Sequence, residues 1–136
     1  MLSDYHTTKN FNSGWMHNIP LMREISPYPT LHIHPDTAGK RGIKDGDWVK
    51  LESPHGWLKV KAEYYEGIRP DVVMMAHGWW HGCKELGLPD MPLTDGGANV
   101  NALYSVDDSA YDPLITAMSS QTLVEVRKYD ENCARV

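Results

Sequence analysis

The stretch from residue 32 to residue 61 constrains the fold more than any other part of the chain. It opens in an alternation of apolar and polar residues at 31–34, the pattern of a half-buried strand. Pro35 can then start a helix, because its missing N–H is a donor that a helix start leaves unbonded, and His34 is expected to cap that helix. Gly42 suits the helix end, because it tolerates the left-handed backbone of a C-terminal cap. The sequence therefore predicts a strand that leads directly into one short helix.

Two turn signals follow this helix. Asp45-Gly46 is a strong turn sequence, and residues 48–51 leave it as a strand. Pro54-His55-Gly56 makes the next reversal, after which residues 57–62 return with alternate apolar side chains on one face. The whole stretch is predicted to be a small β-rich unit that contains one helix.

The segment HPDTAGKRGIKDGDWVKLESPHG also resembles the C-terminal domain of the bacterial and archaeal molybdopterin oxidoreductases, the DMSO reductase family. The resemblance implies a mainly β fold, a double-psi β-barrel like that of aspartate decarboxylase, with a few short helices. On this basis the barrel is expected at residues 15–129, with a flexible N-terminal segment at 1–14 and a C-terminal tail at 130–136. The branch that includes thiosulfate and polysulfide reductases and acetylene hydratase is the most similar.

Composition sets broad limits on partners. The 136 residues suit one domain, and 41% hydrophobic and 23% charged residues are typical of a globular chain. No apolar run approaches the roughly 18 residues of a membrane span, and no export signal pattern is visible. The net charge of −5, without a basic cluster, argues against nucleic acid as a partner. An anionic dinucleotide is therefore expected to be held mainly by neutral donors, and other domains would supply positive charge.

The first candidate binding residues lie in the segment Trp15-Met16-His17-Asn18-Ile19-Pro20-Leu21. Its residues alone fit a surface-docking segment equally well. In the family, a loop at this point runs into a similar Asn-Ile-Pro sequence and touches the pterin and its phosphates. The resemblance therefore implies that His17 and Asn18 bind the cofactor.

The second candidate segment is His77-Gly78-Trp79-Trp80-His81-Gly82, which follows a predicted buried strand at 72–76. Adjacent tryptophans after such a strand cover a core edge or line a flat ligand site. A zinc site would need both histidines on a helix, which the glycines disfavour, and the pair His32 and His34 lacks a nearby third ligand. No metal site is therefore predicted. In the family a similar loop lies against the pterin, which implicates His77, Gly78 and Trp79.

Two further segments complete the candidate site. Asn99 and Asn101 follow Gly97, and amide side chains offer both donors and acceptors, although the segment also fits a loop that ends in a helix. The family has an asparagine two residues before a leucine here, which Asn101 matches. By resemblance alone, Ser120 and Gln121 contact the cofactor just before a final strand predicted at 123–126.

The function implied by the resemblance is binding of a bis(molybdopterin guanine dinucleotide) cofactor, with molybdenum or tungsten, in a larger oxidoreductase. The chain has no cysteine array for an iron–sulfur cluster, no phosphate loop and no nucleophile elbow. The domain alone is therefore expected to be inactive, and its implied partners are upstream catalytic domains and an iron–sulfur electron-transfer subunit. The resemblance places the parent enzyme in a prokaryotic cytoplasm or cell envelope.

Two alternatives use the same barrel. Aspartate decarboxylases cleave themselves at a Gly-Ser bond, and this chain has no Gly-Ser dipeptide. A stand-alone barrel that binds proteins is the other alternative. Polar and aromatic residues gathered at three separate loops favour a small flat ligand, because protein-binding faces are more often one contiguous apolar patch.

Overall fold

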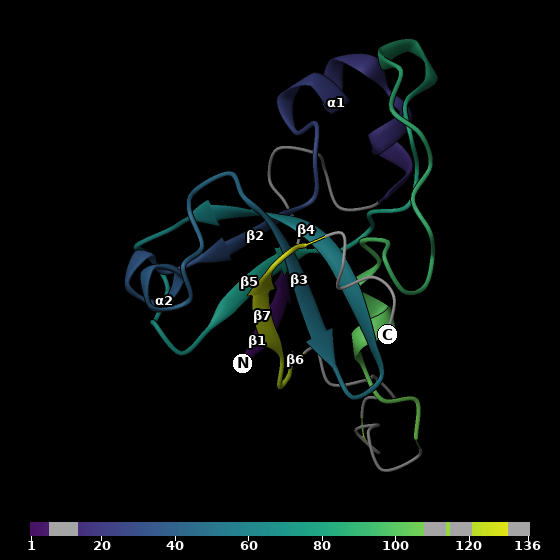
Figure 1. The fold of residues 1–136 in the computed structure, drawn as a ribbon. Coiled ribbons are helices and arrows are strands. Elements are labelled where there is room, and N and C mark those ends of the chain that lie inside the picture. The colour runs from purple at the N-terminus through teal and green to yellow at the C-terminus, as the bar shows by residue number, and fades with distance from the viewer. Residues whose placement is uncertain (6–13, 108–113, 115–120, 131–136) are drawn as a thin grey trace.

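The computed structural model describes residues 1–5, 14–107, 114 and 121–130. Its described part holds one seven-stranded sheet and a few short helices (Figure 1). The strands are β1 (Leu2–Tyr5), β2 (Thr30–Ile33), β3 (Trp48–Ser53), β4 (Gly56–Tyr64), β5 (Val73–Ala76), β6 (Gln121–Thr122) and β7 (Glu125–Lys128). The helices are α1 (Pro20–Ile25) and α2 (Pro35–Lys40), with 3₁₀ turns η1 (Gly14–Asn18), η2 (Lys84–Leu86) and η3 (Val100–Leu103).

The sheet is mixed, in the order β6-β1-β5-β2-β4-β3-β7. The pairs β1–β5 and β2–β4 are parallel, and the other four neighbouring pairs are antiparallel. Parallel neighbours need crossover connections, so strands far apart in the sequence lie side by side. Alternate residues of these strands point into one apolar core, formed by fully or almost fully buried side chains such as Leu31, Ile33, Val49, Leu51, Leu58, Val60, Met75 and Val126.

The predicted strand–helix–hairpin unit is confirmed. His34 caps α2, its Nδ1 accepting the N–H of Asp36 at 3.2 Å. Gly42 follows the helix with φ +66°, and the N–H of Ile43 reaches back to the carbonyl of Ala38 at 2.9 Å. This left-handed ending satisfies helix carbonyls that would otherwise lack a partner. β3 and β4 then form the expected antiparallel hairpin.

The prediction of a flexible segment at 1–14 is wrong for its first residues. Leu2–Tyr5 forms β1, which lies between β5 and β6 in the sheet, and Leu2 is fully buried. The sequence of β1, Leu-Ser-Asp-Tyr, does not alternate between apolar and polar residues, so it does not predict a strand. Only pairing with distant strands stabilises this segment as a strand. Residues 6–13 and the predicted tail beyond 130 lie outside the described residues.

The predicted last strand is shifted. Residues 123–126 alternate in sequence, but β7 begins at Glu125, and Leu123 is 78% exposed. Pairing with β3 sets this register, because it buries Val126 opposite Leu51. A separate two-residue strand, β6, pairs with β1.

One part of the chain projects from the sheet. Figure 1 shows α1 and η1 standing above the strands, beside the segment that follows β5. These pieces come from separate parts of the sequence, and the contacts between them build the candidate site. Among the described residues, no helix is long and apolar enough to cross a membrane.

Candidate functional site

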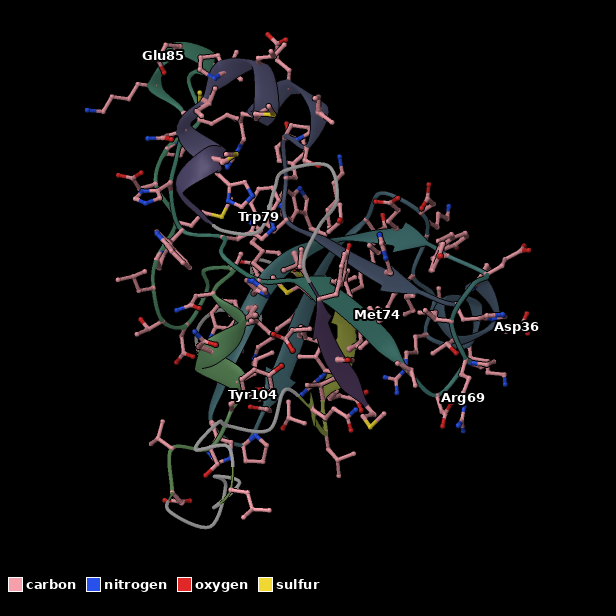
Figure 2. All side chains as sticks on the ribbon, turned by 180° about the vertical axis from the view of Figure 1, so that it is seen from behind. Asp36, Arg69, Met74, Trp79, Glu85 and Tyr104 are labelled. Atoms are coloured by element: carbon pink, nitrogen blue, oxygen red, sulfur yellow. The ribbon has the colours of Figure 1, made fainter. Side chains whose placement is uncertain are left out.

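The loop after β5 is anchored at Trp79. The backbone of Trp79 forms an isolated β-bridge with Ala98, and Gly78 before it adopts φ +90°. Trp79 is 2% exposed, and Figure 2 shows it where the projecting part of the chain meets the sheet. A positive φ is unfavourable for residues with a Cβ, so the glycine lets the loop turn this ring inward.

His17, from η1, packs on this loop. Its Nδ1 donates to the carbonyl of Gly78 at 3.0 Å, and its ring stacks on Trp79 with centroids 4.0 Å apart and planes at 21°. Burial lowers the pKa of His17 to about 4, an effect that the hydrogen bond to Gly78 only partly opposes and that Arg23 and His81 reinforce. The imidazole is therefore neutral at pH 7. Because a carbonyl only accepts, Nδ1 carries the proton and Nε2 is an acceptor.

Arg23, on α1, is a buried cation that the sequence analysis did not identify as a site residue. It is 1% exposed, its guanidinium lies 4.9 Å from the Trp79 ring centroid, and its Nη1 donates to the carbonyl of His81 at 3.1 Å. Burial lowers the pKa of this guanidinium. Arg23 lies just after the segment at 15–21 that resembles the family's loop, but arginines are mostly exposed, so no local pattern indicates that this one is buried.

Three ring and guanidinium nitrogens in this group lack a hydrogen-bond partner within the described structure. They are His17 Nε2, Arg23 Nε and Trp79 Nε1. Buried polar atoms are normally satisfied, and unsatisfied ones point to a water or a ligand. One acceptor and two donors beside a flat aromatic ring suit a flat heterocycle such as a pterin, whose edge carries both donors and acceptors. We call His17, Arg23 and Trp79 the buried triad.

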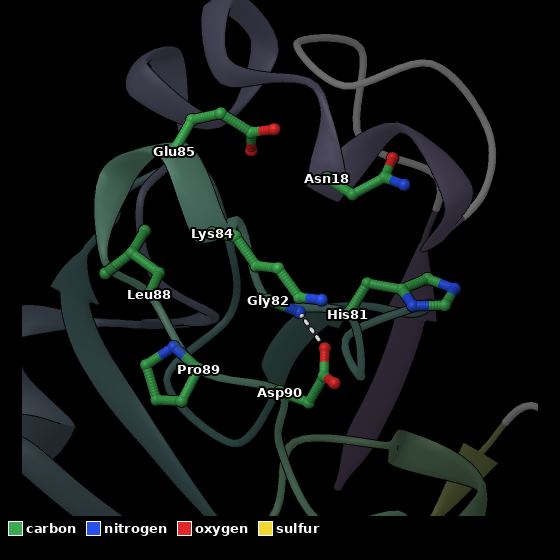
Figure 3. Close-up of a pocket in the computed structure, with 8 residues that line it drawn as sticks. All are labelled: Asn18, His81, Gly82, Lys84, Glu85, Leu88, Pro89 and Asp90. Atoms are coloured by element: carbon green, nitrogen blue, oxygen red, sulfur yellow. Dashed lines mark hydrogen bonds between the residues drawn. The ribbon is translucent and has the colours of Figure 1, made fainter.

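Asn18, the last residue of η1, lines a cavity of about 510 Å³ (Figure 3). Its carbonyl accepts the Cys83 thiol at 3.7 Å, and the Gly82 N–H donates to Asp90 Oδ1 at 2.7 Å. The cavity is lined by Asn18, His81, Gly82, Lys84, Glu85, Leu88, Pro89 and Asp90. Asn18 is the only predicted site residue in this described lining, so the cavity and the buried triad are neighbouring but different places.

His77 is engaged by the first strand. Its Nδ1 lies 3.6 Å from Asp4 Oδ2, and its backbone N–H donates to the carbonyl of Tyr5 at 3.3 Å. Asp4 also accepts the hydroxyl of Tyr104, whose pKa is raised by burial first and then by this carboxylate. Asp4 is therefore a second residue that sequence reasoning missed, because it lies in the segment that was predicted to be flexible.

The two predicted asparagines, Asn99 and Asn101, lie beside the loop that follows β5, but their side-chain amides are in different environments. Asn99 caps η3, its Oδ1 accepting the N–H of Asn101 at 3.3 Å while its Nδ2 donates to the carbonyl of Leu93 at 3.3 Å. Asn101 is exposed. The segment thus has the predicted form of a loop that ends in a short helix, and the β-bridge at Ala98 keeps it next to Trp79.

Of the two remaining predicted residues, only Gln121 is described by the structure. Gln121 lies at the sheet edge on β6, opposite Ser3 of β1. Ser120 lies outside the described residues. The part of the chain that the structure describes contains no group of three or more His, Cys, Asp or Glu side chains placed to hold a metal ion, and His77 and His81 lie in a loop without helical structure.

Comparison with known proteins identifies the family of this chain. The family model described as molydopterin dinucleotide binding domain matches residues 1–122. Formate dehydrogenase 2 subunit alpha of Nitratidesulfovibrio vulgaris is 32% identical over 96% of this chain and 13% of its own length. The arsenate respiratory reductase molybdopterin-containing subunit of Chrysiogenes arsenatis is 36% identical over 76% of this chain and 11% of its own length. The chain thus spans about an eighth of these relatives or less.

A solved structure confirms the expected barrel. Acetylene hydratase from Pelobacter acetylenicus superposes with a TM-score of 0.78 and 23% identity, over 94% of this chain and 18% of that chain. The predicted double-psi β-barrel is therefore confirmed. The comparisons give no support to a stand-alone protein-interaction module. With a family model that matches nearly its whole length, the chain belongs to the molydopterin dinucleotide binding domain family.

Proposed function

We propose that the buried triad and the backbone of residues 77–80 form the part of this domain that contacts the cofactor, a molybdopterin guanine dinucleotide. The observation that carries the proposal is the set of three buried nitrogens without partners, one acceptor and two donors, at His17, Arg23 and Trp79. A flat ligand that bonds to these atoms would recover the free energy that is lost when polar groups are buried unpaired. The guanidinium of Arg23 would also offset negative charge on the ligand.

In this proposal the residues of the domain bind and orient the cofactor, and they take no part in the redox reaction. His17 is neutral, is fixed by Gly78 and lies against Trp79, so it can accept one hydrogen bond from the edge of a flat ring. Trp79 supplies a buried π surface and an indole N–H donor. The redox chemistry would belong to the metal that the cofactor holds in the complete enzyme, so the isolated domain would be inactive.

The remaining predicted contacts fit the same proposal as secondary positions. Asn101 is exposed beside the loop and can offer its amide, whereas Asn99 would have to give up its cap of η3 to do so. His77 would contact the cofactor while its ring stays close to the carboxylate of Asp4. Upstream catalytic domains and an iron–sulfur electron-transfer subunit are the partners proposed for a molybdenum or tungsten oxidoreductase of this family.

The test uses the two halves of the cofactor as separate probes. Pterin-6-carboxylate and GDP are titrated into the ¹⁵N-labelled chain, and the indole N–H signals and backbone amides are followed. We expect pterin-6-carboxylate to shift the Trp79 indole N–H and the amides of residues 77–80, because the triad presents groups that complement a pterin edge. GDP is expected to shift different amides.

Two tryptophan variants provide a matched pair. W79F keeps an aromatic ring but removes the indole donor and should weaken pterin binding, whereas W80F removes the neighbouring indole, which is only partly buried, and should not. If pterin-6-carboxylate leaves the Trp79 signal unchanged at millimolar concentration, or if W79F and W80F behave alike, the assignment of the triad is wrong.

A further inference from the structure

The outward side of the β3–β4–β7 hairpin region carries an unusual concentration of cations and tryptophans. We define it as the lysine–aromatic face, formed by Trp48, Lys50, Trp57, Lys59, Lys61 and Arg127. These residues alternate with the buried core residues of the same strands, so they point away from the barrel interior. The face lies on different strands from those that lead into the buried triad.

Strand pairing places three of these cations in one row. Lys50 on β3 is directly opposite Lys59 on β4 and directly opposite Arg127 on β7. Like charges directly opposite each other destabilise a sheet. A row of three cations on a chain with a net charge of −5 is therefore a local arrangement that folding alone does not favour.

Only part of this charge is neutralised. Glu52 pairs with Lys50 at 3.0 Å and with Arg127 at 2.5 Å, and both cations lower the pKa of its carboxyl group. The carboxylates at the edges of the face are engaged elsewhere, Glu125 with Arg41 and Glu63 close to His32. Within the described residues, Lys59 and Lys61 form no ion pair.

Aromatic rings hold these two ammonium groups in place. Lys59 Nζ lies 4.2 Å from the ring centroid of Tyr129 and 5.4 Å from that of Trp48. Lys61 Nζ lies 4.7 Å from the ring centroid of Tyr28. Such cation–π contacts attract the ammonium group without neutralising its charge. Positioning before binding also reduces the side-chain entropy that a partner must otherwise overcome.

We propose that the lysine–aromatic face is a docking surface for an acidic, extended segment of a separate polypeptide chain. Lys59 and Lys61 are two residues apart on one strand, which sets their Cα atoms about 6.5 Å apart. Alternate side chains of an extended peptide repeat at the same distance, so carboxylates at every second position would meet both lysines. The excess positive charge of the face supplies the attraction.

Single-stranded nucleic acid is the competing partner, and the face suits it less well. Bases bind to such sheets by stacking on open aromatic rings. Here Trp57 already stacks on Tyr129 at 6.4 Å, with Lys50 Nζ 5.1 Å from its ring centroid. The net charge of −5 also repels a polyphosphate backbone.

The test titrates the full chain with three probes and follows tryptophan fluorescence and backbone amide shifts. The probes are a ten-residue peptide of alternating Glu and Thr, the same peptide with Gln in place of Glu, and a ten-residue oligothymidylate. We expect the Glu peptide alone to bind, with an affinity that falls as salt is added. The double variant K59Q/K61Q should bind the Glu peptide about tenfold more weakly, which corresponds to a loss of about 1.4 kcal/mol in binding free energy.

The control variant K40Q/K44Q removes the same charge from exposed positions on and after α2 and should bind the Glu peptide like the unmodified chain. The proposal is overturned if the Glu peptide does not bind, if both double variants lose the same affinity, or if oligothymidylate binds more tightly. It is also overturned if sedimentation shows that the face joins two copies of this chain, with association lost in K59Q/K61Q. None of these outcomes depends on pterin binding, so the proposed function is tested separately.

Discussion

His17 and Trp79 stack with 4.0 Å between ring centroids, although one comes from before α1 and the other from after β5. This contact joins the 3₁₀ turn η1 to the loop that follows β5. It also fixes the environment of His17, which is 1% exposed and has its pKa lowered to about 4.

The stability of the domain should depend on pH through His17. Its pKa is lower in the folded state than the ordinary 6.5, so the unfolded state binds a proton more readily. The contribution of His17 is complete above pH 6.5 and is lost as the pH falls from 6.5 towards 4, by at most about 3 kcal/mol. Urea unfolding at a series of pH values should show this loss. In H17Q the loss over the same range should be smaller, and equal losses in both proteins would contradict the assignment.

Replacing Arg23 should separate stability from ligand binding. Its buried guanidinium has no carboxylate partner among the described residues, and a buried charge without a counter-ion lowers stability. We expect R23M to leave the free energy of unfolding unchanged or to raise it by about 1 kcal/mol, because methionine fills similar apolar space. The same variant should bind pterin-6-carboxylate more weakly.

The control for this prediction is R69M, at a guanidinium that is 80% exposed and pairs with Asp71. Its free energy of unfolding should change by less than about 0.5 kcal/mol, and its pterin binding should be unaffected. A strongly destabilised R23M that still binds pterin would show that Arg23 is structural only.

Gly82 should not tolerate a side chain. A Cβ at this position would collide with the carbonyl oxygen of Leu88 and the backbone of Pro89, so G82A must push the cavity wall away. We expect a loss of about 1–3 kcal/mol in the free energy of unfolding. By contrast, a Cβ at Gly39 on α2 meets nothing within 4 Å, and G39A should stabilise the domain by about 0.5–1 kcal/mol. Thermal unfolding of the two variants gives the comparison, and equal shifts in the same direction would contradict it.

The first strand should be essential to the sheet. Leu2 is fully buried in the core and β1 lies between β5 and β6, so L2A should lower the free energy of unfolding by about 2–4 kcal/mol. Leu21 on α1 is 67% exposed, and L21A should change it by less than about 0.5 kcal/mol. Urea unfolding measures both, and a neutral L2A would mean that β1 is dispensable.

Local sequence determined the central unit of the fold. Pro35, Gly42 and the turn at Asp45-Gly46 each restrict their own backbone, and the alternation in β4 selects one buried face. For that reason the cap at His34, the helix end and the hairpin could all be predicted. The family resemblance added the barrel and the cofactor class, both of which the comparisons support.

Tertiary structure decided what depends on partners far away in the sequence. β1 has no pattern of its own and becomes a strand only by pairing with β5 and β6, and β7 takes its register from β3. Likewise, no local rule buries Arg23, and it joins the candidate site only because its guanidinium lies over Trp79 and donates to the carbonyl of His81. A short-range pattern reports the conformation of its own residues, whereas the pairing and desolvation of such groups are properties of the assembled fold.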